Sequence, residues 1–350
     1  MAESNVSASE QSIGFLDLDL AQCQKRFVEL GGKPFHAKIA REKVFGEGLL
    51  DYELMTALPA GLRGRLTEQL PILRGTELER TESQDNTTKL LIGFAGGDAV
   101  ETVHIPSVRK NKGATLCVSS QAGCAVGCPF CASGKLGLSR NLSSAEIIEQ
   151  YLRGRQIGEL ARSVVMGVGE PLHNIDNLVQ ALEVVRTQMN IGARRITVST
   201  VGFPDRLRRL AQTKPHFQLA ISLHTPDDEQ RDQLVPAMAG VPIEDVLAAG
   251  DDWFVQTGRE ITYEYVLLGG DNDSPGHAER LADRLRGRRA MVNLIPYNPI
   301  EELTGRRPHA DDVEGFREVL EQRGIVATVR WSRGLKSDSA CGQLRLRTPG

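Results

Sequence analysis

Three cysteines on one short loop are the residues of this 350-residue chain best suited to hold a metal centre. Cys124, Cys128 and Cys131 follow the apolar run 115–119 and are separated by three and then two residues. Three thiolates satisfy three irons of a cubane iron–sulfur cluster and leave the fourth iron open, whereas purely structural clusters generally use four protein ligands. The loop therefore predicts a reactive four-iron, four-sulfur cluster.

A structural zinc ion is the alternative for the same loop. Zinc prefers closed tetrahedral coordination, and its ligands usually arrive as two separated pairs. Here a fourth ligand would have to come from Cys117, Cys341 or a histidine. Because the chain is large and shows no export signal, a disulfide scaffold is not expected, and Cys23 is interpreted as a packing residue.

Polar residues follow several predicted strands at the point where each strand ends. Gly169 and Glu170 come directly after the run 163–168, where glycine permits close backbone approach and a carboxylate can hold the amine of a ligand. The alternative is a tight turn before Pro171. Further polar residues follow later strands: Ser199, Ser222, His224 and Asn298. The carboxyl ends of parallel strands meet at one rim, so we expect a common site there, although His224 alone would also fit a buried rim histidine.

The elements that must position these residues alternate regularly along the chain. The predicted strands are 115–119, 163–168, 196–200, 217–223, 261–267, 291–295 and 325–329. The predicted helices are 144–154, 175–189, 205–212, 243–257, 274–286 and 312–323. Continuous apolar strands between amphipathic helices are typical of a parallel sheet covered on both faces. The sequence therefore predicts an α/β fold with a partial or complete (β/α) barrel and an active site at the carboxyl ends of its strands.

The N-terminal part of the chain has a different character, with helical patterns and little strand signal. We expect a small all-helical accessory domain there, followed by a β-hairpin linker built from the runs 90–94 and 99–105. The predicted units are a disordered tail at 1–12, the helical domain at 13–80, the linker at 81–109, the barrel at 110–335 and a mobile segment at 336–350 that carries Cys341.

The charge and hydropathy of the chain exclude little. The net charge is −3 and the pI about 6.2, values that neither support nor exclude an RNA substrate. Local basic stretches could neutralise phosphates and lie at 109–112, 206–209, 284–289 and 330–333. No run of about eighteen apolar residues and no signal peptide is visible, so we expect a cytoplasmic protein without a membrane contact.

The cysteine spacing resembles that of the radical S-adenosylmethionine (SAM) enzymes. Further segments resemble the RlmN/Cfr family of RNA adenine methyltransferases, and these are 117–124, 140–143, 167–172, 199–200, 221–224, 293–299 and 340–344. The resemblance extends from about residue 40 to residue 344, and the order and spacing of the segments make it specific. It implies a radical SAM barrel that holds a four-iron, four-sulfur cluster on the three cysteines of the loop.

The resemblance also implies how the cofactor is bound. S-adenosylmethionine would chelate the open iron and contact residues at the carboxyl ends of the strands. By the family's motifs these residues are Gly169, Glu170, Ser199, Ser222, Leu223, His224 and Asn298.

Three residues outside the rim receive roles from the resemblance alone. Cys341 would be the methyl carrier, an S-methylcysteine formed with one S-adenosylmethionine and activated by the radical from a second. Cys117 would be the resolving thiol that releases the RNA–protein adduct by forming a disulfide with Cys341. Glu101 would be the base that removes the proton from C2 of the adenine.

The family relationship further implies the substrates and partners. These are the adenosine of the 23S rRNA peptidyl-transferase centre, the tRNA adenosine 3′ to the anticodon, and an external electron donor such as a flavodoxin-like reductant. We expect a monomer. Two alternatives stay open: a C8-directed, Cfr-type 23S rRNA adenine methyltransferase, and a zinc-stabilised RNA-binding module without catalysis.

Overall fold

The alternating apolar runs form the parallel part of one large sheet. The computed structural model describes residues 13–109, 112–135, 137–300, 305–331 and 342–344. The parallel strands are β4 (Ala114–Cys117), β7 (Leu160–Val165), β8 (Ile196–Thr200), β9 (Gln218–Ser222), β10 (Ile261–Leu267), β11 (Ala290–Pro296) and β12 (Ala327–Val329). They lie side by side in this order. Because β12 ends the sheet and does not pair with β4, the described strands form a partial barrel rather than a closed one.

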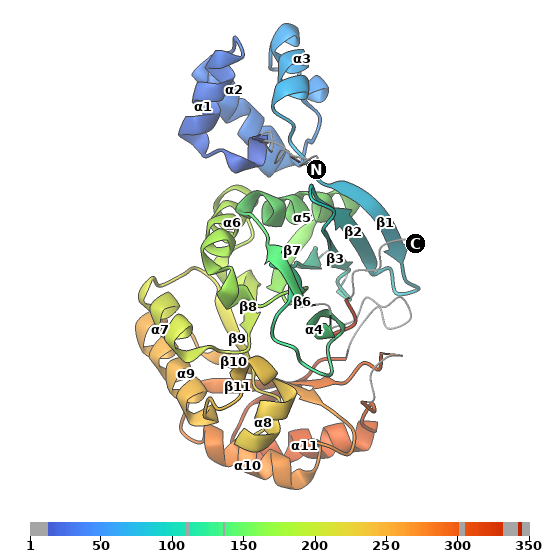
Figure 1. Ribbon diagram of the computed structural model, residues 1–350, viewed down its shortest axis with the longest axis vertical. Coiled ribbons are helices and arrows are strands. Elements are labelled where there is room, and N and C mark those ends of the chain that lie inside the picture. The colour runs from blue at the N-terminus through green and yellow to red at the C-terminus, as the bar shows by residue number, and fades with distance from the viewer. Residues whose placement is uncertain (1–12, 110–111, 136, 301–304, 332–341, 345–350) are drawn as a thin grey trace, which may run out of the picture.

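Helices cover the outer face of this sheet, as Figure 1 shows. They are α5 (Ser144–Ile157), α6 (Ile175–Gln188), α7 (Pro204–Gln212), α8 (Asp228–Leu234), α9 (Ile243–Thr257), α10 (Pro275–Leu285) and α11 (Ala310–Gln322). Their ends carry the expected signals: Ser143 and Glu146 form a capping box at the start of α5, and Gly258 ends α9 in the left-handed conformation. The short helix α8 was not predicted. No helix in the described part of the chain combines the length and apolar character needed to cross a bilayer.

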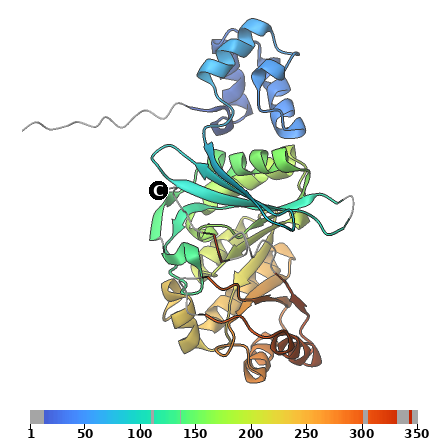
Figure 2. The same cartoon turned by 90° about the vertical axis from the view of Figure 1, so that its right-hand side faces the viewer.

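The N-terminal helices form a lobe at one end of the molecule (Figures 1 and 2). The lobe contains α1 (Leu20–Glu29), α2 (Pro34–Arg41) and α3 (Ala60–Gln69), with short turns η1 (Phe15–Asp17), η2 (Glu42–Glu47) and η3 (Tyr52–Leu54). Its core is aromatic, since the buried Phe15 ring contacts the rings of Phe27, Phe45 and Tyr52. The helical patterns predicted for this region are therefore present.

The boundary between the lobe and the sheet differs from the prediction. Residues 76–80, assigned to the helical domain, belong to strand β1 (Thr76–Glu82). The hairpin of β2 (Thr88–Gly93) and β3 (Ala99–Ile105) is present, but it continues the large sheet, because β1, β2, β3 and β4 pair antiparallel in that order. Strand β1 is an edge strand of mostly charged, exposed residues, so it lacks the apolar alternation by which strands are recognised.

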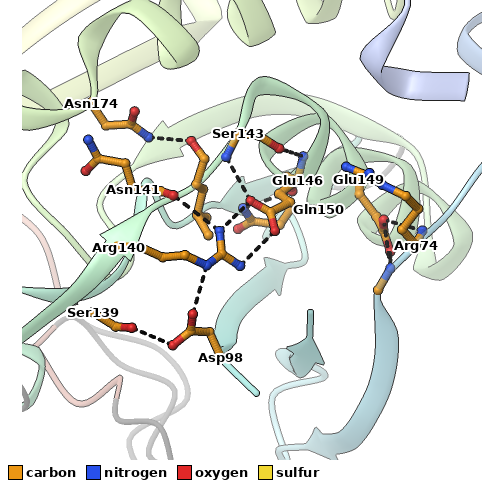
Figure 3. Close-up of polar contacts among 12 residues, drawn as sticks. Arg74, Asp98, Ser139, Arg140, Asn141, Ser143, Glu146, Glu149, Gln150 and Asn174 are labelled. Carbon is orange, nitrogen blue, oxygen red and sulfur yellow. Dashed lines mark hydrogen bonds and ion pairs between the residues drawn. The ribbon is translucent and has the colours of Figure 1, made fainter. Parts of the chain in front are cut away.

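Helix α5 holds the lobe against the sheet. Its buried Glu149 accepts hydrogen bonds from the backbone nitrogens of Arg74 and Gly75, at 2.9 and 3.0 Å (Figure 3). About two turns further on, Gln156 donates from Nε2 to the carbonyl of Gly48 at 2.8 Å. These contacts fix the chain where it passes from the helical lobe into β1.

Candidate active site

The cysteine loop is the tip of a small hairpin that leaves the sheet after β4. Strand β5 (Gln121–Cys124) ends in the first cysteine, and β6 (Gly137–Asn141) returns antiparallel to it. Cys128 and Cys131 lie in the turn before the short helix α4 (Ala132–Lys135). We call residues 124–131 the cluster loop. Gly123 must be a glycine, because its φ is +79° and a Cβ there would overlap the carbonyl oxygen of Gly137.

Arg140 ties this hairpin to the barrel (Figure 3). Its guanidinium binds Asp98 at 2.8 Å and both carboxylate oxygens of Glu146 on α5 at 2.8 and 2.9 Å. The next residue, Asn141, accepts from Gln121 Nε2 at 2.7 Å and donates to the carbonyl of His173 at 3.0 Å. The segment 140–143, which carried part of the family resemblance, therefore acts by positioning the cluster loop.

A cavity opens at the carboxyl ends of the parallel strands. The predicted site residues that line it are Cys124, Cys128, Cys131, Gly169, Glu170, Ser199, Ser222, His224 and Asn298. Leu223 is fully buried and does not line the cavity; its backbone nitrogen donates to the carbonyl of Glu264 at 3.0 Å. The structure thus brings together residues that lie as far apart in the chain as Cys124 and Asn298.

Glu170 is the residue whose surroundings the sequence could not reveal. Its carboxylate accepts hydrogen bonds from the backbone nitrogens of Leu172 and Val201, both at 2.9 Å, and from the hydroxyl of Thr200. Burial raises the pKa of Glu170, and these three donors act against that rise. Gly169, with φ of +108°, passes so close to Gln121 that a Cβ would lie 2.6 Å from the Gln121 Cβ. Both carboxylate oxygens of Glu170 are therefore bound by the protein itself.

His224 packs on the cluster loop in a strained conformation. Its φ is +67°, which is uncommon for a residue with a side chain, and its ring meets Phe130 edge-on with centroids 4.9 Å apart. Nδ1 accepts from the backbone nitrogen of Val266 at 3.1 Å, so the proton of the neutral ring is on Nε2. Burial and, to a lesser degree, Arg231 lower the pKa of His224 to about 3. The ring is a neutral hydrogen-bond donor at the cavity wall.

Three other predicted rim residues contribute polar groups from separate strands. The hydroxyls of Ser199 and Ser222 lie 3.5 Å apart on β8 and β9. Asn298, which follows β11, accepts at Oδ1 from Arg307 at 3.2 Å. These groups can orient a ligand by hydrogen bonds but cannot carry a charge at neutral pH.

The cluster loop fits a multi-iron centre. The described residues contain no group of three potential ligands already arranged around a metal ion, so the fit rests on the chemistry of the three thiols and their surroundings. Burial raises the pKa of Cys124 to about 11, and the pKa of Cys128 further, so these thiols lose their protons only to a bound cation. Beside the loop, Arg231 is fully buried, and its Nε and Nη1 find no acceptor among the described residues. Such an arginine suits a group of negative charge.

Cys117 lies beside the cavity and meets the C-terminal end of the chain. It packs in a small apolar cluster with Val103, Val168 and Leu344, and Leu344 also lines the cavity. Cys341 itself lies outside the described residues. No disulfide links two cysteines of the described residues, and the disulfide predicted between Cys117 and Cys341 is not supported.

The residues that follow Cys341 are held by α4, which directly follows the cluster loop. The carbonyl of Gly342 accepts from the backbone nitrogen of Ala132 at 2.8 Å, and the carbonyl of Leu344 accepts from Ser133 Oγ at 2.9 Å. Gly342 lines the cavity. The chain immediately after Cys341 therefore lies between Cys117 and the cluster loop.

Glu101 is buried and does not line the cavity. Its carboxylate forms an ion pair with Lys89 at 2.8 Å, and its carbonyl accepts from Ser119 Oγ at 2.6 Å. This burial shows that Glu101 is not a solvent-facing strand residue. Val103 is paired with Cys117, and residues two apart on a strand point to the same face of the sheet. Glu101 therefore lies on the same face as Cys117.

Glu264 and Tyr297 line the cavity and were not predicted from the sequence. Glu264 is buried on β10, and burial raises its pKa to about 7 against the lowering effects of Arg330 and Asn293. The Tyr297 hydroxyl is buried and has no hydrogen-bond partner among the described residues. A signal for Glu264 was present: an acidic residue in the middle of a strand predicted to be buried on both faces demands a partner or a ligand.

Comparison with known proteins agrees with this geometry. The Radical SAM superfamily model matches residues 118–282. A probable dual-specificity RNA methyltransferase RlmN of Rhodopirellula baltica is 44% identical over 94% of this chain and 90% of its own length. The RlmN of Synechococcus sp. strain CC9311 is also 44% identical, over 91% of this chain and 94% of its own.

A solved structure shares the whole fold. The radical SAM methyltransferase from Sphaerobacter thermophilus is 40% identical, covers 95% of this chain and 99% of its own, and superposes with a TM-score of 0.89. Radical SAM enzymes use a four-iron, four-sulfur cluster and S-adenosylmethionine, so the predicted cofactors are confirmed and the zinc alternative is not. The matched fold, the three-cysteine loop and this identity over nearly the full length place the chain in the RlmN family of dual-specificity RNA methyltransferases within the radical SAM superfamily.

Proposed function

We propose that this protein methylates C2 of an adenine in RNA, with Cys341 as the carrier of the one-carbon unit. The proposed substrates are the adenosine of the 23S rRNA peptidyl-transferase centre and the tRNA adenosine 3′ to the anticodon. The printed names of the relatives, dual-specificity RNA methyltransferases, support the two kinds of RNA. The choice of C2 and the role of Cys341 rest on the motif resemblance together with the placement of residues 342–344.

The observation that carries the proposal is the position of the chain just after Cys341. Gly342, the residue that follows Cys341 in the chain, lines the cavity. Leu344, three residues after Cys341, contacts the apolar cluster that contains Cys117. These two contacts support the proposal that the two cysteines meet during the reaction, as disulfide exchange requires.

In the proposed reaction, residues of this chain bind the cofactors, carry the one-carbon unit and release the methylated RNA. When bound, the cluster and S-adenosylmethionine supply the methyl group and the radical that activates it. The Cys341 sulfur carries the carbon to the adenine, which gives a covalent RNA–protein adduct. Glu101 takes the C2 proton, and the Cys117 thiolate attacks the Cys341 sulfur. The adduct must also lose one electron, which the cluster, when bound, would accept. The carbon–sulfur bond then breaks with its electron pair left on the carbon, which takes up a proton to become the C2 methyl group. A disulfide forms between the two cysteines, and an external reductant returns both to thiols.

Cationic side chains at the edge of the cavity suit an RNA substrate. Arg307 contacts Asn298, and Arg330 contacts the cavity-lining Met166 at 3.1 Å. The Trp331 ring is half exposed and lies under the Arg307 guanidinium, 5.8 Å from centroid to Cζ. Arginine neutralises phosphates, and an exposed aromatic ring stacks on unpaired bases. Neither feature is needed by a cavity that takes only a small molecule.

The test of the carrier role is isotopic. The anaerobically reconstituted protein is incubated with S-adenosylmethionine labelled on the methyl group and then mapped by mass spectrometry. We expect label on the peptide that contains Cys341, no label in Cys341→Ala, and normal labelling in Cys23→Ala, whose buried thiol lies in the helical lobe. An unlabelled Cys341 peptide in active enzyme would refute the role.

The release step is tested with radiolabelled RNA. In Cys117→Ala the adduct should persist on a denaturing gel, whereas the Cys23→Ala control should show none. Mass spectrometry of the modified nucleoside then distinguishes methylation at C2 from the C8 alternative. The cytoplasmic location, the external electron donor and the monomeric state inferred from the sequence stay predictions.

A further inference from the structure

A second cleft lies at the amino-terminal ends of the parallel strands, at the opposite end of the barrel from the active site. One wall consists of residues that follow β3 and precede β4. The other wall is formed by the starts of β4 and β7 and by η5 (Ala193–Arg195), the short turn before β8. The cleft has a volume of about 600 Å³, which is within the range of ligand pockets. It is therefore a hollow that can admit a ligand, not a flat patch of surface.

Four cationic side chains from separate segments line this cleft, and these are Arg109, Lys112, Arg162 and Arg195. We call the hollow between them the basic cleft. All four side chains are exposed, and none forms an ion pair with a carboxylate in the described part of the chain. Among the described residues that line the cleft, Glu159 is the one acid, so four cations and one carboxylate give a formal charge of +3. The whole chain carries −3, so positive charge is concentrated at this end of the barrel.

Arginines on the outer helices are paired with acids, as α10 shows. Arg280 binds Asp227 at 2.8 Å, and Arg284 binds Asp228 at 2.9 Å. Such surface pairs add little stability, but they neutralise the charge of each arginine. The basic cleft has no such neutralisation from the described residues. This arrangement is expected of a surface that meets an anion from outside the chain.

Two of the arginines lie next to each other on the sheet. Ser163 is paired with Ile196, so Arg162 and Arg195, each one residue earlier, lie side by side on neighbouring strands. Neighbouring strands are about 4.8 Å apart, and like charges at such positions destabilise a sheet unless an anion lies between them. The fork of an arginine guanidinium matches the oxygens of a phosphate group. The pair therefore suits a phosphate better than a single point charge.

Two hydroxyl groups lie among these cations. Thr115 on β4 is paired with Arg162, so the two side chains point to the same face of the sheet. Ser107 Oγ accepts a hydrogen bond from the backbone nitrogen of Arg109 at 3.2 Å, which leaves the hydroxyl hydrogen for a ligand. Both residues line the basic cleft, so neutral donors supplement its charged ones.

Packed side chains separate the basic cleft from the active-site cavity. The two hollows share none of the described residues. Ile105, which is paired with Thr115 and lines the basic cleft, packs against the apolar cluster that contains Cys117. Met166 lines the cavity and follows Arg162 by four residues, which is about 13 Å along a strand. An RNA whose adenine occupies the cavity can thus reach the basic cleft only with phosphates outside the target nucleotide.

We propose that the basic cleft binds backbone phosphates of the RNA substrate outside the nucleotide that is methylated. The inference rests on RNA as the substrate, in line with the family of the chain, but not on the methylated position or on the carrier role of Cys341. The contact anchors the RNA while the target adenosine occupies the cavity. It carries no base specificity, because phosphates are the same in every sequence.

The test measures equilibrium binding of a full-length tRNA transcript to the reconstituted holoenzyme at several salt concentrations. In Arg162→Gln/Arg195→Gln the affinity at about 0.1 M salt should fall about tenfold. The slope of log K against log salt should become less steep by about 1.5, because two phosphate contacts are lost. Ethylation of single phosphates identifies these contacts. At positions outside the target nucleotide, ethylation should interfere with binding to the wild type but not to the variant.

The matched control is Arg186→Gln/Arg317→Gln, which removes the same charge from α6 and α11, where each arginine is paired with a glutamate of its own helix. This variant should bind RNA like the wild type. The cleft arginines are exposed, so their replacement should leave the fold intact, which cluster absorbance and a thermal scan establish for each variant. Unchanged affinity and salt slope in a folded cleft variant would overturn the proposal, as would an equal loss in the control.

Two further measurements distinguish RNA from other anions. Pyrophosphate is titrated into the wild type alone, and tight binding that the cleft variant loses while its RNA binding is unchanged would assign the cleft to a small phosphate compound. Slower reduction of the cluster by an acidic flavoprotein, again with unchanged RNA binding, would assign the cleft to a protein partner. Either result refutes the proposal. A holoenzyme that binds RNA as expected but does not methylate it leaves the inference intact and counts only against the proposed function.

Discussion

Replacement of Glu170 by glutamine should destabilise the fold, because this carboxylate is held by three donors of the protein. Glutamine offers one acceptor oxygen, and its amide nitrogen would face the backbone nitrogen of Leu172 or Val201, each now 2.9 Å from a carboxylate oxygen. A buried donor left without a partner costs about 1–3 kcal/mol. Burial raises the pKa of Glu170, so the neutral amide recovers part of the cost of burying a charge. We expect a net loss of about 2 kcal/mol in the free energy of unfolding.

Equilibrium unfolding in urea, without cofactor and under reducing conditions, measures this loss. With a urea dependence near about 3 kcal/mol per molar, the midpoint should fall by about 0.7 M. Glu229→Gln is the matched control, since Glu229 is exposed at the start of α8 and its substitution should stay within about 0.5 kcal/mol. An unchanged midpoint for Glu170→Gln, together with a large loss of S-adenosylmethionine affinity, would show that the carboxylate serves the ligand and that the reasoning is wrong.

Further outcomes follow from other contacts. Burial raises the pKa of Glu264 to about 7, so the free energy of unfolding of the wild type should fall by up to about 3 kcal/mol as the pH rises from about 4.5 to about 7. Unfolding measured from pH 5 to 8 should show this fall in the wild type and not in Glu264→Gln. Arg140→Ala should expose the cluster loop to limited proteolysis, while the helical lobe stays resistant. An RNA hairpin should quench the fluorescence of Trp331 but not of buried Trp253, so Trp331→Phe should abolish the quenching. Arg231→Met should make the cluster harder to reduce, which EPR-monitored redox titration would detect as a lower potential; an unchanged potential would contradict the charge argument.

The barrel could be predicted from the sequence because its strands are continuous apolar runs. The predicted ranges 196–200 and 261–267 coincide with β8 and β10, and helix α9 was predicted without error. Strand β1 could not be predicted, because its charged residues face solvent at the edge of the sheet and it pairs with β2. Burial leaves a pattern in sequence, whereas pairing alone does not.

The candidate site was predictable only where a function depends on local spacing. The three cysteines lie within eight residues, so their common role is visible directly. Glu170 was interpreted from its motif as a ligand contact. The donors that bind its carboxylate could not be predicted, because Thr200 and Val201 lie about thirty residues further along the chain. Glu264 left a signal as an acidic residue in a buried strand, but its partner Asn293, on the neighbouring strand, could not be predicted. Long-range partners of this kind leave no trace in a single sequence.

The hydrogen bonds from Ala132 and Ser133 to the carbonyls of Gly342 and Leu344 join α4, which follows the cluster loop, to residues 342–344. Thermodynamic linkage is reciprocal. If binding of the cluster orders α4, it also strengthens the binding of residues 342–344, and bound residues 342–344 stabilise the cluster by the same free energy. Oxidative loss of the cluster would then also weaken the binding of the segment next to Cys341, the proposed carrier. The enzyme would lose both functions together, so that RNA–protein adducts would not accumulate.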